Sequence, residues 1–522
     1  PTAGGSISEA LVGTPRFINP VLARSQIDKD ISELVYGSLV SVDATGAVTN
    51  ELASQITISD DKKEYIIKLK SDIFFHDGEP IEASDVVFTI ERIKDTIIQS
   101  PERSKWVGVD VQEIASNELL FKLDKAYPLF LQNLELGIIP KHVWDQVSVE
   151  EFPFSTLNIQ PIGSGPFRVT QVLRDNQEII TSYNLTSFQD SVYKPYLDNI
   201  SLQIVKSPED QLDLYTRGLT DAAAGIDPST INKLDLSKTN IRDHVLPRVF
   251  ALFYKQEKDT PLSYKEVRQA IDSVIDKETI VEEVFNGYAR GIGSPLPPTS
   301  PHTTQYEATD VDRKTTLEQA RALLIKNSWK FNTERNVWTK KVQDKDIDLA
   351  FTLYAPNSDD LILTANRIRN DLSELQIPVT VLYQDLESLT QDVIRPRTYE
   401  LLLFGYVTDI PADLYPFWHS SGRIDPGLNI AEYVSIASDK ELETIRTETD
   451  SAKIEASYKK LQEEISEDIP ASFLFTPEFI YLQRENITQE KPSGSLAFPE
   501  DRFRNADSWY IKTENILPVF LN

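Results

Sequence analysis

The chain has 522 residues, and its 81 Asp and Glu residues outnumber its 53 Lys and Arg residues, which gives a formal net charge of −28 at pH 7. At about 100–200 residues per domain, this length predicts several structural units with ample hydrophobic core. So negative a chain repels nucleic acids and anionic lipid headgroups, so we expect no nucleic-acid partner. The absence of Cys excludes disulfides, thiolate metal sites and a cysteine nucleophile.

The chain also contains no Met, and no apolar run approaches the ~20 residues that span a bilayer. We interpret the sequence as a soluble, mature or trimmed fragment that starts at Pro1, from which any targeting leader has been removed.

Residues 48–160 are predicted to form a compact α+β unit. Apolar and charged residues alternate over 65–69, which is typical of a half-buried strand, and a second such strand covers 119–123. Between them, Ser84 is the predicted N-cap of a helix whose apolar stripe extends to Ile97.

Strands and helices alternate between residues 250 and 480, which predicts a second lobe and a ligand cleft at the boundary between the lobes. The pattern predicts a helix over 267–275, a helix ending at Gly287, a helix opened by a Thr315–Glu318 capping box, a βαβ unit over 347–383, a strand over 401–404 that ends at Gly405, and a helix over 454–465 that Pro470 ends.

Catalytic motifs are scarce. The five His residues are far apart without an HExxH pair, so we expect no metal site, and His76 is interpreted as a structural turn residue. Two SxxK sequences lack a following KTG, and the Gly163-Ser164-Gly165 turn has no His nearby, so a chain crossing explains it better than a nucleophile. The residues favour a binding scaffold over an enzyme, with no cofactor.

Several short sequences occur in an order that identifies a family. Around residues 51–86 they are Glu51-Leu52-Ala53-Ser54, Ile58-Ser59-Asp60-Asp61, Phe74-Phe75-His76-Asp77-Gly78-Glu79-Pro80 and Ala83-Ser84-Asp85-Val86. Further pieces lie at 15–20, 139–144, 162–167, 267–277 and 295–298. Together they resemble the signature of family 5 extracellular solute-binding proteins, the dipeptide-, oligopeptide- and nickel-binding receptors of ABC importers.

This resemblance implies an α/β, two-lobed periplasmic-binding-protein-like fold (type II, cluster C) with an extra inserted domain. Domain I would comprise 1–47, 161–246 and 490–522, domain II the insertion 48–160, and domain III the second lobe 247–489. Strands near 247–252 and 482–490 would form the hinge.

The resemblance also implies a binding site. In peptide-binding relatives, an Asp after a Gly-aromatic step on a domain III strand pairs with the peptide ammonium, and Gly405-Tyr406-Val407-Thr408-Asp409 matches that step. A strand-end carboxylate in a water-poor cleft suits a cation. The spacing to the next aromatic is longer than in relatives, so Asp413 is the alternative carboxylate.

Other candidate ligand-binding residues are aromatic or basic. Aromatic side chains are expected to line the cleft, and bidentate Arg donors are expected to bind a peptide carboxylate. These candidates are Tyr415, Trp418, Phe17 and Trp106, with Arg248 and Arg423 as the two arginines.

We therefore expect an extracytoplasmic receptor, periplasmic or at the cell surface, that binds peptides and delivers them to the membrane permease of an ABC importer. The resemblance further implies a monomer, anchored by a lipid through a trimmed N-terminus. Three alternatives stay open. The chain could be a receptor for a non-peptide solute such as a nickel chelate or a sugar. It could instead be a cleft hydrolase that uses carboxylates, or a signalling or adhesion receptor without a permease.

Overall fold

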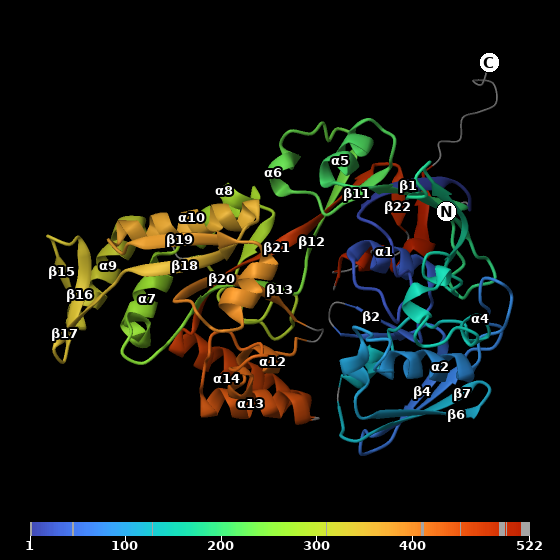
Figure 1. Cartoon of the computed structure of the whole chain (residues 1–522), viewed down its shortest axis with the longest axis horizontal. Helices are drawn as coiled ribbons and strands as arrows, with labels where there is room; N and C mark the ends of the chain where they lie inside the picture. The colour runs from blue at the N-terminus through green and yellow to red at the C-terminus, as the bar shows by residue number, and fades with distance from the viewer. Residues whose placement is uncertain are drawn as a thin grey trace. The chain divides into compact units, whose positions relative to one another are not determined.

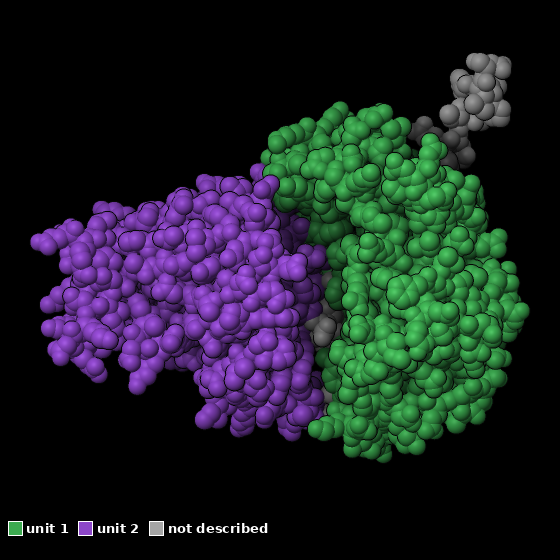
Figure 2. Space-filling model, viewed as in Figure 1, with its two compact units in different colours: residues 1–244, 479–522 green, residues 245–478 purple. Residues whose placement is uncertain are grey.

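The computed structural model describes residues 3–43, 46–127, 129–308, 311–408, 412–448, 450–489, 496 and 498–512. The chain divides into two compact units, unit 1 with residues 1–244 and 479–522 and unit 2 with residues 245–478 (Figure 2). Within the described ranges, every helix is too short or too polar to cross a bilayer.

Unit 1 contains a mixed sheet in the order β21-β11-β1-β10-β9-β8. Its β1 (Ser6–Val12) runs parallel to both β10 (Asn199–Val205) and β11 (Ala222–Ala224), although these strands are about 200 residues away in the chain. The unit is therefore built from distant segments, and its last segment includes the end of β21 (Ala471–Arg484).

A second, four-stranded antiparallel sheet of unit 1 has the order β4-β5-β7-β6. In β5 (Glu64–Leu69) alternate residues are buried, as the sequence predicted, and β7 (Glu118–Leu123) pairs with it. Helix α2 (Ala83–Lys94) contacts β6 (Val109–Ala115) of this sheet through its apolar stripe (Figure 1).

The remaining elements of unit 1 are α1 (Gln26–Val35), β2 (Val40–Val42), β3 (Val48–Asn50), β4 (Ala53–Ile58), η1 (Arg103–Trp106), α3 (Phe130–Asn133), α4 (Lys141–Trp144), η2 (Phe152–Phe154), η3 (Thr156–Asn158), β8 (Phe167–Arg174), β9 (Ile180–Ser187), α5 (Pro208–Thr216), α6 (Pro228–Ile231), β12 (Thr239–Val245), β22 (Ile487–Gln489), η7 (Pro499–Phe503), η8 (Ala506–Ser508) and β23 (Trp509–Ile511).

Unit 2 is organised around a sheet with the order β19-β18-β20-β13-β21, and β14 (Ala289–Gly291) also pairs with β21. Alternate residues of β13 (Arg248–Tyr254) enter two different apolar clusters, because successive side chains of a strand point to opposite faces. Both faces of the sheet are therefore covered, which explains why β13 is a continuous apolar run.

The predicted βαβ unit is confirmed: β18 (Phe351–Pro356) and β19 (Val379–Gln384) are parallel, and α10 (Asp359–Glu374) contacts both strands. Its predicted start at residue 347 is wrong, because residues 345–348 form a separate strand that pairs within another sheet. The other elements of unit 2 are η4 (Pro261–Ser263), α7 (Lys265–Val274), α8 (Lys277–Phe285), α9 (Arg313–Lys326), β15 (Lys330–Asn332), β16 (Val337–Val342), β17 (Lys345–Asp348), α11 (Leu386–Leu389), the π-helical η5 (Thr390–Ile394), β20 (Leu401–Val407), α12 (Tyr415–Trp418), η6 (Ser420–Gly422), α13 (Ile436–Thr447) and α14 (Ser451–Asp468).

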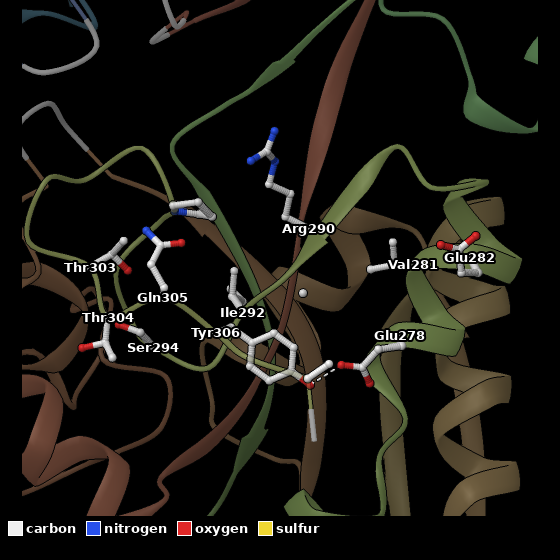
Figure 3. Close-up of a pocket in the computed structure, with 13 residues that line it drawn as sticks. Glu278, Val281, Glu282, Arg290, Ile292, Ser294, Thr303, Thr304, Gln305 and Tyr306 are labelled. Carbon is white, nitrogen blue, oxygen red and sulfur yellow. Dashed lines mark hydrogen bonds between the residues drawn. The ribbon is translucent and has the colours of Figure 1, made fainter. Parts of the chain in front are cut away.

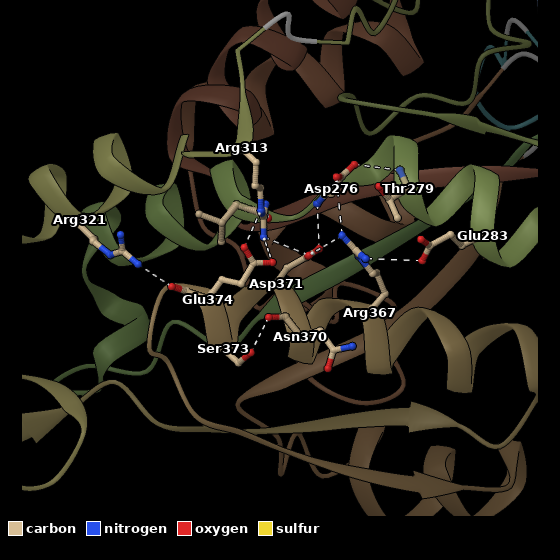
Figure 4. A network of polar contacts seen from close by, with 11 residues as sticks. Asp276, Thr279, Glu283, Arg313, Arg321, Arg367, Asn370, Asp371, Ser373 and Glu374 are labelled. Atoms are coloured by element: carbon tan, nitrogen blue, oxygen red, sulfur yellow. Dashed lines mark hydrogen bonds and ion pairs between the residues drawn. The ribbon is translucent and has the colours of Figure 1, made fainter. Parts of the chain in front are cut away.

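A buried carboxylate joins three helices of unit 2 (Figure 4). Asp371 on α10 accepts the backbone N–H of Asp276 at 3.0 Å, and guanidinium nitrogens of Arg313 and Arg367 lie 3.2 Å from its Oδ1. Burial nevertheless raises the pKa of Asp371 to about 6. The network holds the start of α8 and the start of α9 against α10.

Three other predicted boundaries are wrong, each for a local reason. Helix α2 begins two residues before the expected point, because Glu82 is the N-cap and the Asp85 carboxylate accepts its N–H at 2.8 Å. Helix α9 is capped by Asp312, whose carboxylate accepts the Thr315 N–H at 3.1 Å. Strand β20 continues past Gly405 to Val407, since it pairs with β13 along its whole length.

The helix of Ile97 also ends earlier than predicted, at Lys94, and Ile97 is exposed. The helices that end at Gly287 and before Pro470 agree with the sequence prediction, and α8 ends in a left-handed cap at Asn286. The division of the chain into three domains, with its hinge strands, stays a prediction.

Candidate functional site

The end of β20 and the short helix α12 carry most of the predicted ligand-binding residues. Gly405 lies opposite Phe250 of β13, and a Cβ at this position would be 2.8 Å from the Phe250 ring. That ring stacks on Phe475 with centroids 5.1 Å apart. Gly405 is therefore required by packing inside the sheet, since any side chain would displace the aromatic stack.

Tyr406 and Trp418 are core residues of unit 2. The Tyr406 hydroxyl donates to the carbonyl of Pro295 at 2.5 Å and accepts the Trp418 indole N–H at 3.3 Å. Trp418 is 0% exposed and packs on Phe253 and Phe473. Burial raises the pKa of Tyr406 above its usual range. Both side chains are buried in the core next to the end of β20.

Asp413 is held by an ion pair within unit 2. The Arg446 guanidinium on α13 contacts both carboxylate oxygens: its Nη2 donates to Oδ2 at 2.5 Å, and its Nε donates to Oδ1 at 3.2 Å. The same guanidinium lies 4.0 Å from the centroid of the Tyr415 ring, which in turn stacks on His419. In this arrangement the Asp413 charge is already compensated, whereas half-buried Tyr415 keeps part of its ring accessible.

The three other predicted residues of unit 2 have different surroundings. Asp409 lies outside the described residues. Arg423 is exposed, and its Nε donates to the carbonyl of Ser420 at 3.2 Å. Arg248 is half-buried at the first position of β13 and is paired with Val407 on the neighbouring strand β20.

The two predicted residues of unit 1, Phe17 and Trp106, differ in burial. Phe17 is half-buried in a loop, and its backbone N–H donates to the Asp28 carboxylate at 3.0 Å. Trp106 is 1% exposed and packs against Phe121 and Phe130 in the core. Trp106 therefore stabilises the small sheet and offers no surface to a ligand.

His76 and the Gly163-Ser164-Gly165 turn are structural, as expected. The His76 Nε2–H donates to the Gly165 carbonyl at 3.1 Å, and Nδ1 accepts the Gly163 N–H at 3.3 Å. A Cβ at Gly163 would lie 2.1 Å from the carbonyl oxygen of Val35, so this is a close chain crossing. Burial lowers the pKa of His76 to about 4.

Unit 2 contains a cavity of about 460 Å³ between α8, β14 and the segment 294–308 (Figure 3). Two of its charged residues, Glu278 and Arg290, already have partners. The Tyr306 hydroxyl donates to the Glu278 carboxylate at 2.5 Å, and Arg290 donates to Glu478 at 2.9 Å. The cavity is polar, but Tyr306, Glu278 and Arg290 already form hydrogen bonds within the protein.

Unit 1 contains a smaller cavity of about 240 Å³, next to α1 and η7. Three basic side chains and six carboxyl groups line it. They are Lys29, Lys105 and Arg504, with Glu33, Glu51, Glu102, Glu135, Glu500 and Asp501.

The carboxyl groups of this cavity differ in their electrostatic surroundings. Arg504 pairs with Glu135 and Asp501 at 2.8 Å each. Glu33 has no hydrogen-bond or ion-pair partner among the described residues. Burial raises the pKa of Glu33 to about 8 and that of Glu135 to about 7, with Arg504 opposing both shifts.

No pattern in the sequence indicates this cavity. Its residues come from segments as far apart as Pro20 and Arg504, and Glu33 occupies an ordinary position of an amphipathic helix. No spacing rule identifies such a set, because 81 acids make local carboxylate clusters common. Across the described ranges, no group of three or more His, Asp or Glu side chains has the arrangement of a metal site.

The fold is that of substrate-binding proteins of ABC transporters. A solved structure with this fold is CtaP from Listeria monocytogenes, with a TM-score of 0.81 and 24% identity over 98% of this chain and 100% of that one. The oligopeptide-binding protein AppA from Bacillus subtilis, solved with a nonapeptide, gives a TM-score of 0.72 at 22% identity, covering 98% and 100%.

Sequence relatives agree with the fold. AppA of Bacillus subtilis is 24% identical over 98% of this chain and 92% of its own length. Di/tripeptide-binding protein 1 of Pseudomonas aeruginosa is 24% identical over 88% and 86%. Residues 47–425 match the family described as bacterial extracellular solute-binding proteins, family 5, middle region, and the chain belongs to this family.

Proposed function

We propose that this chain is the peptide receptor of an ABC importer, which binds a peptide outside the cytoplasm and delivers it to the membrane permease. The observation that carries this proposal is the family match over 47–425, together with relatives named for binding oligopeptides and di- or tripeptides. The proposal includes that the chain acts as a monomer anchored by lipid, and that it leaves its ligand covalently unchanged.

Peptide recognition combines main-chain hydrogen bonds with a charge pair to the ammonium group and side-chain pockets of low selectivity. For that charge pair we propose Asp409, since Asp413 is compensated by Arg446. Tyr415 and Arg423 remain candidates for ligand contact because part of each side chain is accessible. The location of the ligand between two lobes stays a prediction.

Titration calorimetry with a mixed pool of short peptides tests this function. We expect saturable binding and, by mass spectrometry after overnight incubation, an unaltered peptide. Turnover of the peptide would instead support a hydrolase. NikZ from Campylobacter jejuni, a similar solved structure, contains Ni(L-His). Its TM-score is 0.72 at 22% identity, covering 97% of this chain and 99% of that one. The experiment therefore includes a separate titration with the nickel–histidine chelate. If the chelate binds and no peptide does, the ligand is a metal chelate and the proposed peptide ligand is wrong.

Asp409→Asn and Asp413→Asn form a matched pair of variants. We expect Asp409→Asn to weaken peptide binding at least tenfold while the melting temperature is kept. Asp413→Asn should lower the melting temperature, since it leaves Arg446 without its carboxylate, and should affect binding less. The opposite pattern would assign the ammonium contact to Asp413.

A further inference from the structure

The cavity of unit 1 is lined by six acidic and three basic side chains. Lys105 lies 2.7 Å from Glu102, and Lys29 lies 3.8 Å from Glu500. With Arg504 bound to Glu135 and Asp501, each basic side chain of the lining is already paired with an acid of the same lining. Glu33 and Glu51 are left without a cation in contact.

Glu33 and Glu51 differ in what compensates them. Glu51 accepts the Ser41 hydroxyl at 3.0 Å. Glu33 is a carboxyl group on α1 with no donor among the described residues, and burial raises its pKa to about 8, so it is largely protonated in the free protein at neutral pH. A positively charged group that enters the cavity would pair with the ionised form of Glu33 in surroundings that are poorer in water than the protein surface.

A second, independent feature points to a ligand. Ser32 lines the same cavity, is more than nine-tenths buried, and its hydroxyl has no hydrogen-bond partner among the residues that the structure describes. Buried hydroxyls are usually satisfied, so the unpartnered hydroxyl of Ser32 on the cavity lining is able to hydrogen-bond a polar atom that enters the cavity. Ser32 and Glu33 are consecutive on α1 and both line this cavity, so each is able to contact an occupant.

The size and lining of the cavity limit that occupant. A volume of about 240 Å³ is below the roughly 300–1,000 Å³ of pockets that hold a whole drug-sized ligand, so it suits a single side chain. Aromatic rings of Tyr36, Tyr193 and Phe498 contribute to the wall. Aromatic faces and carboxylates together favour an organic ammonium or guanidinium group.

We propose that the unit 1 cavity binds the positively charged side chain of a Lys or Arg residue of the ligand, with Glu33 as its counter-charge and Ser32 as an additional hydrogen-bond acceptor. This inference rests on the proposed peptide-binding function and adds a preference for basic peptides. The elevated pKa of Glu33 is consistent with it, because the carboxyl group keeps its proton while no cation is in contact and releases that proton when the ligand cation pairs with it.

The test uses the full chain and pentapeptides of alanine in which a single Lys occupies each position in turn, with the neutral norleucine peptide as reference. At one position, we expect Lys to bind about tenfold or more tightly than norleucine, which corresponds to about 1.4 kcal/mol. In Glu33→Gln that preference should fall to about twofold or less, while norleucine peptides bind as before.

Glu113→Gln is the matched control, since it removes one exposed carboxylate of unit 1 on strand β6, outside the cavity. It should keep the preference for Lys. Ser32→Ala, which removes a single oxygen, should reduce the preference partially. A thermal melt of each variant verifies that it is folded.

Equal binding of Lys and norleucine peptides at every position would overturn the inference and leave the proposed peptide receptor intact. Equal loss of both peptides in folded Glu33→Gln would also overturn it, since Glu33 would then act without regard to ligand charge. If no peptide of the set or of a mixed pool binds, the proposed function itself fails.

Discussion

The guanidinium of Arg502 lies 2.8 Å from the carboxylate of Glu9, and both side chains are almost fully buried, at 2% and 0% exposure. Arg502 also contacts Asp30 at 2.7 Å, and the Tyr481 hydroxyl donates to Glu9 at 2.7 Å. These groups connect β1, α1, η7 and the end of β21 in unit 1. Removing one partner of such a cluster leaves a buried charge unmatched.

Arg502→Met should therefore lower the free energy of unfolding by about 3–5 kcal/mol, since Met keeps the apolar volume but not the charge. Chemical denaturation measures the change. Arg217→Met is the control: Arg217 pairs with Asp213 at 2.9 Å on an exposed helix face, where an ion pair contributes about 0.3–0.5 kcal/mol. Equal effects of the two substitutions would contradict a special role of the buried cluster.

Trp418→Ala should destabilise unit 2 by about 3–5 kcal/mol, because the indole fills the core among Phe253, Tyr433 and Phe473. Phe417→Ala, at the neighbouring half-buried position, should have a clearly smaller effect. Denaturant unfolding followed by circular dichroism compares the two. If Trp418→Ala were fully stable and merely weakened ligand binding, the core position of this residue would be wrong.

Stability should fall in acid through His76. Its folded-state pKa of about 4 is below the ordinary value near 6.5, so only the unfolded chain binds this proton between those values. The stabilisation is complete above about pH 6.5 and is lost as the pH falls towards 4, by an amount on the order of 3 kcal/mol. Unfolding free energies measured from pH 4 to 7 should depend less on pH in His76→Gln. An unchanged slope would mean that His76 is solvated.

Glu33 should act in the opposite direction. Its folded-state pKa of about 8 exceeds the ordinary value near 4.5, so the folded chain retains a proton that the unfolded chain has lost. Its contribution is therefore favourable in acid and declines as the pH rises from about 4.5 to 8. Glu33→Gln should become more stable relative to the natural chain over that range, as pH-dependent melting temperatures will record. A constant difference would show that the Glu33 carboxylate ionises normally.

Local elements and family membership are readable from the amino-acid pattern alone. Apolar periodicity predicted β5, α7 and the βαβ unit of β18, α10 and β19, because burial on one face repeats with the period of the element. Helix starts were less predictable: several polar residues near α2 and α9 are able to cap, and only the folded backbone selects Glu82 and Asp312.

The environment of individual aromatic and charged side chains depends on how distant segments pack together. Trp418 and Trp106 resemble ligand-binding aromatics in sequence, yet packing places both in cores. Glu9 and Arg502 meet although they are 493 positions apart, and the Glu33 cavity unites equally distant segments. Pattern along a chain records which face of an element is buried, whereas the partner of a charge depends on which segments the fold brings together.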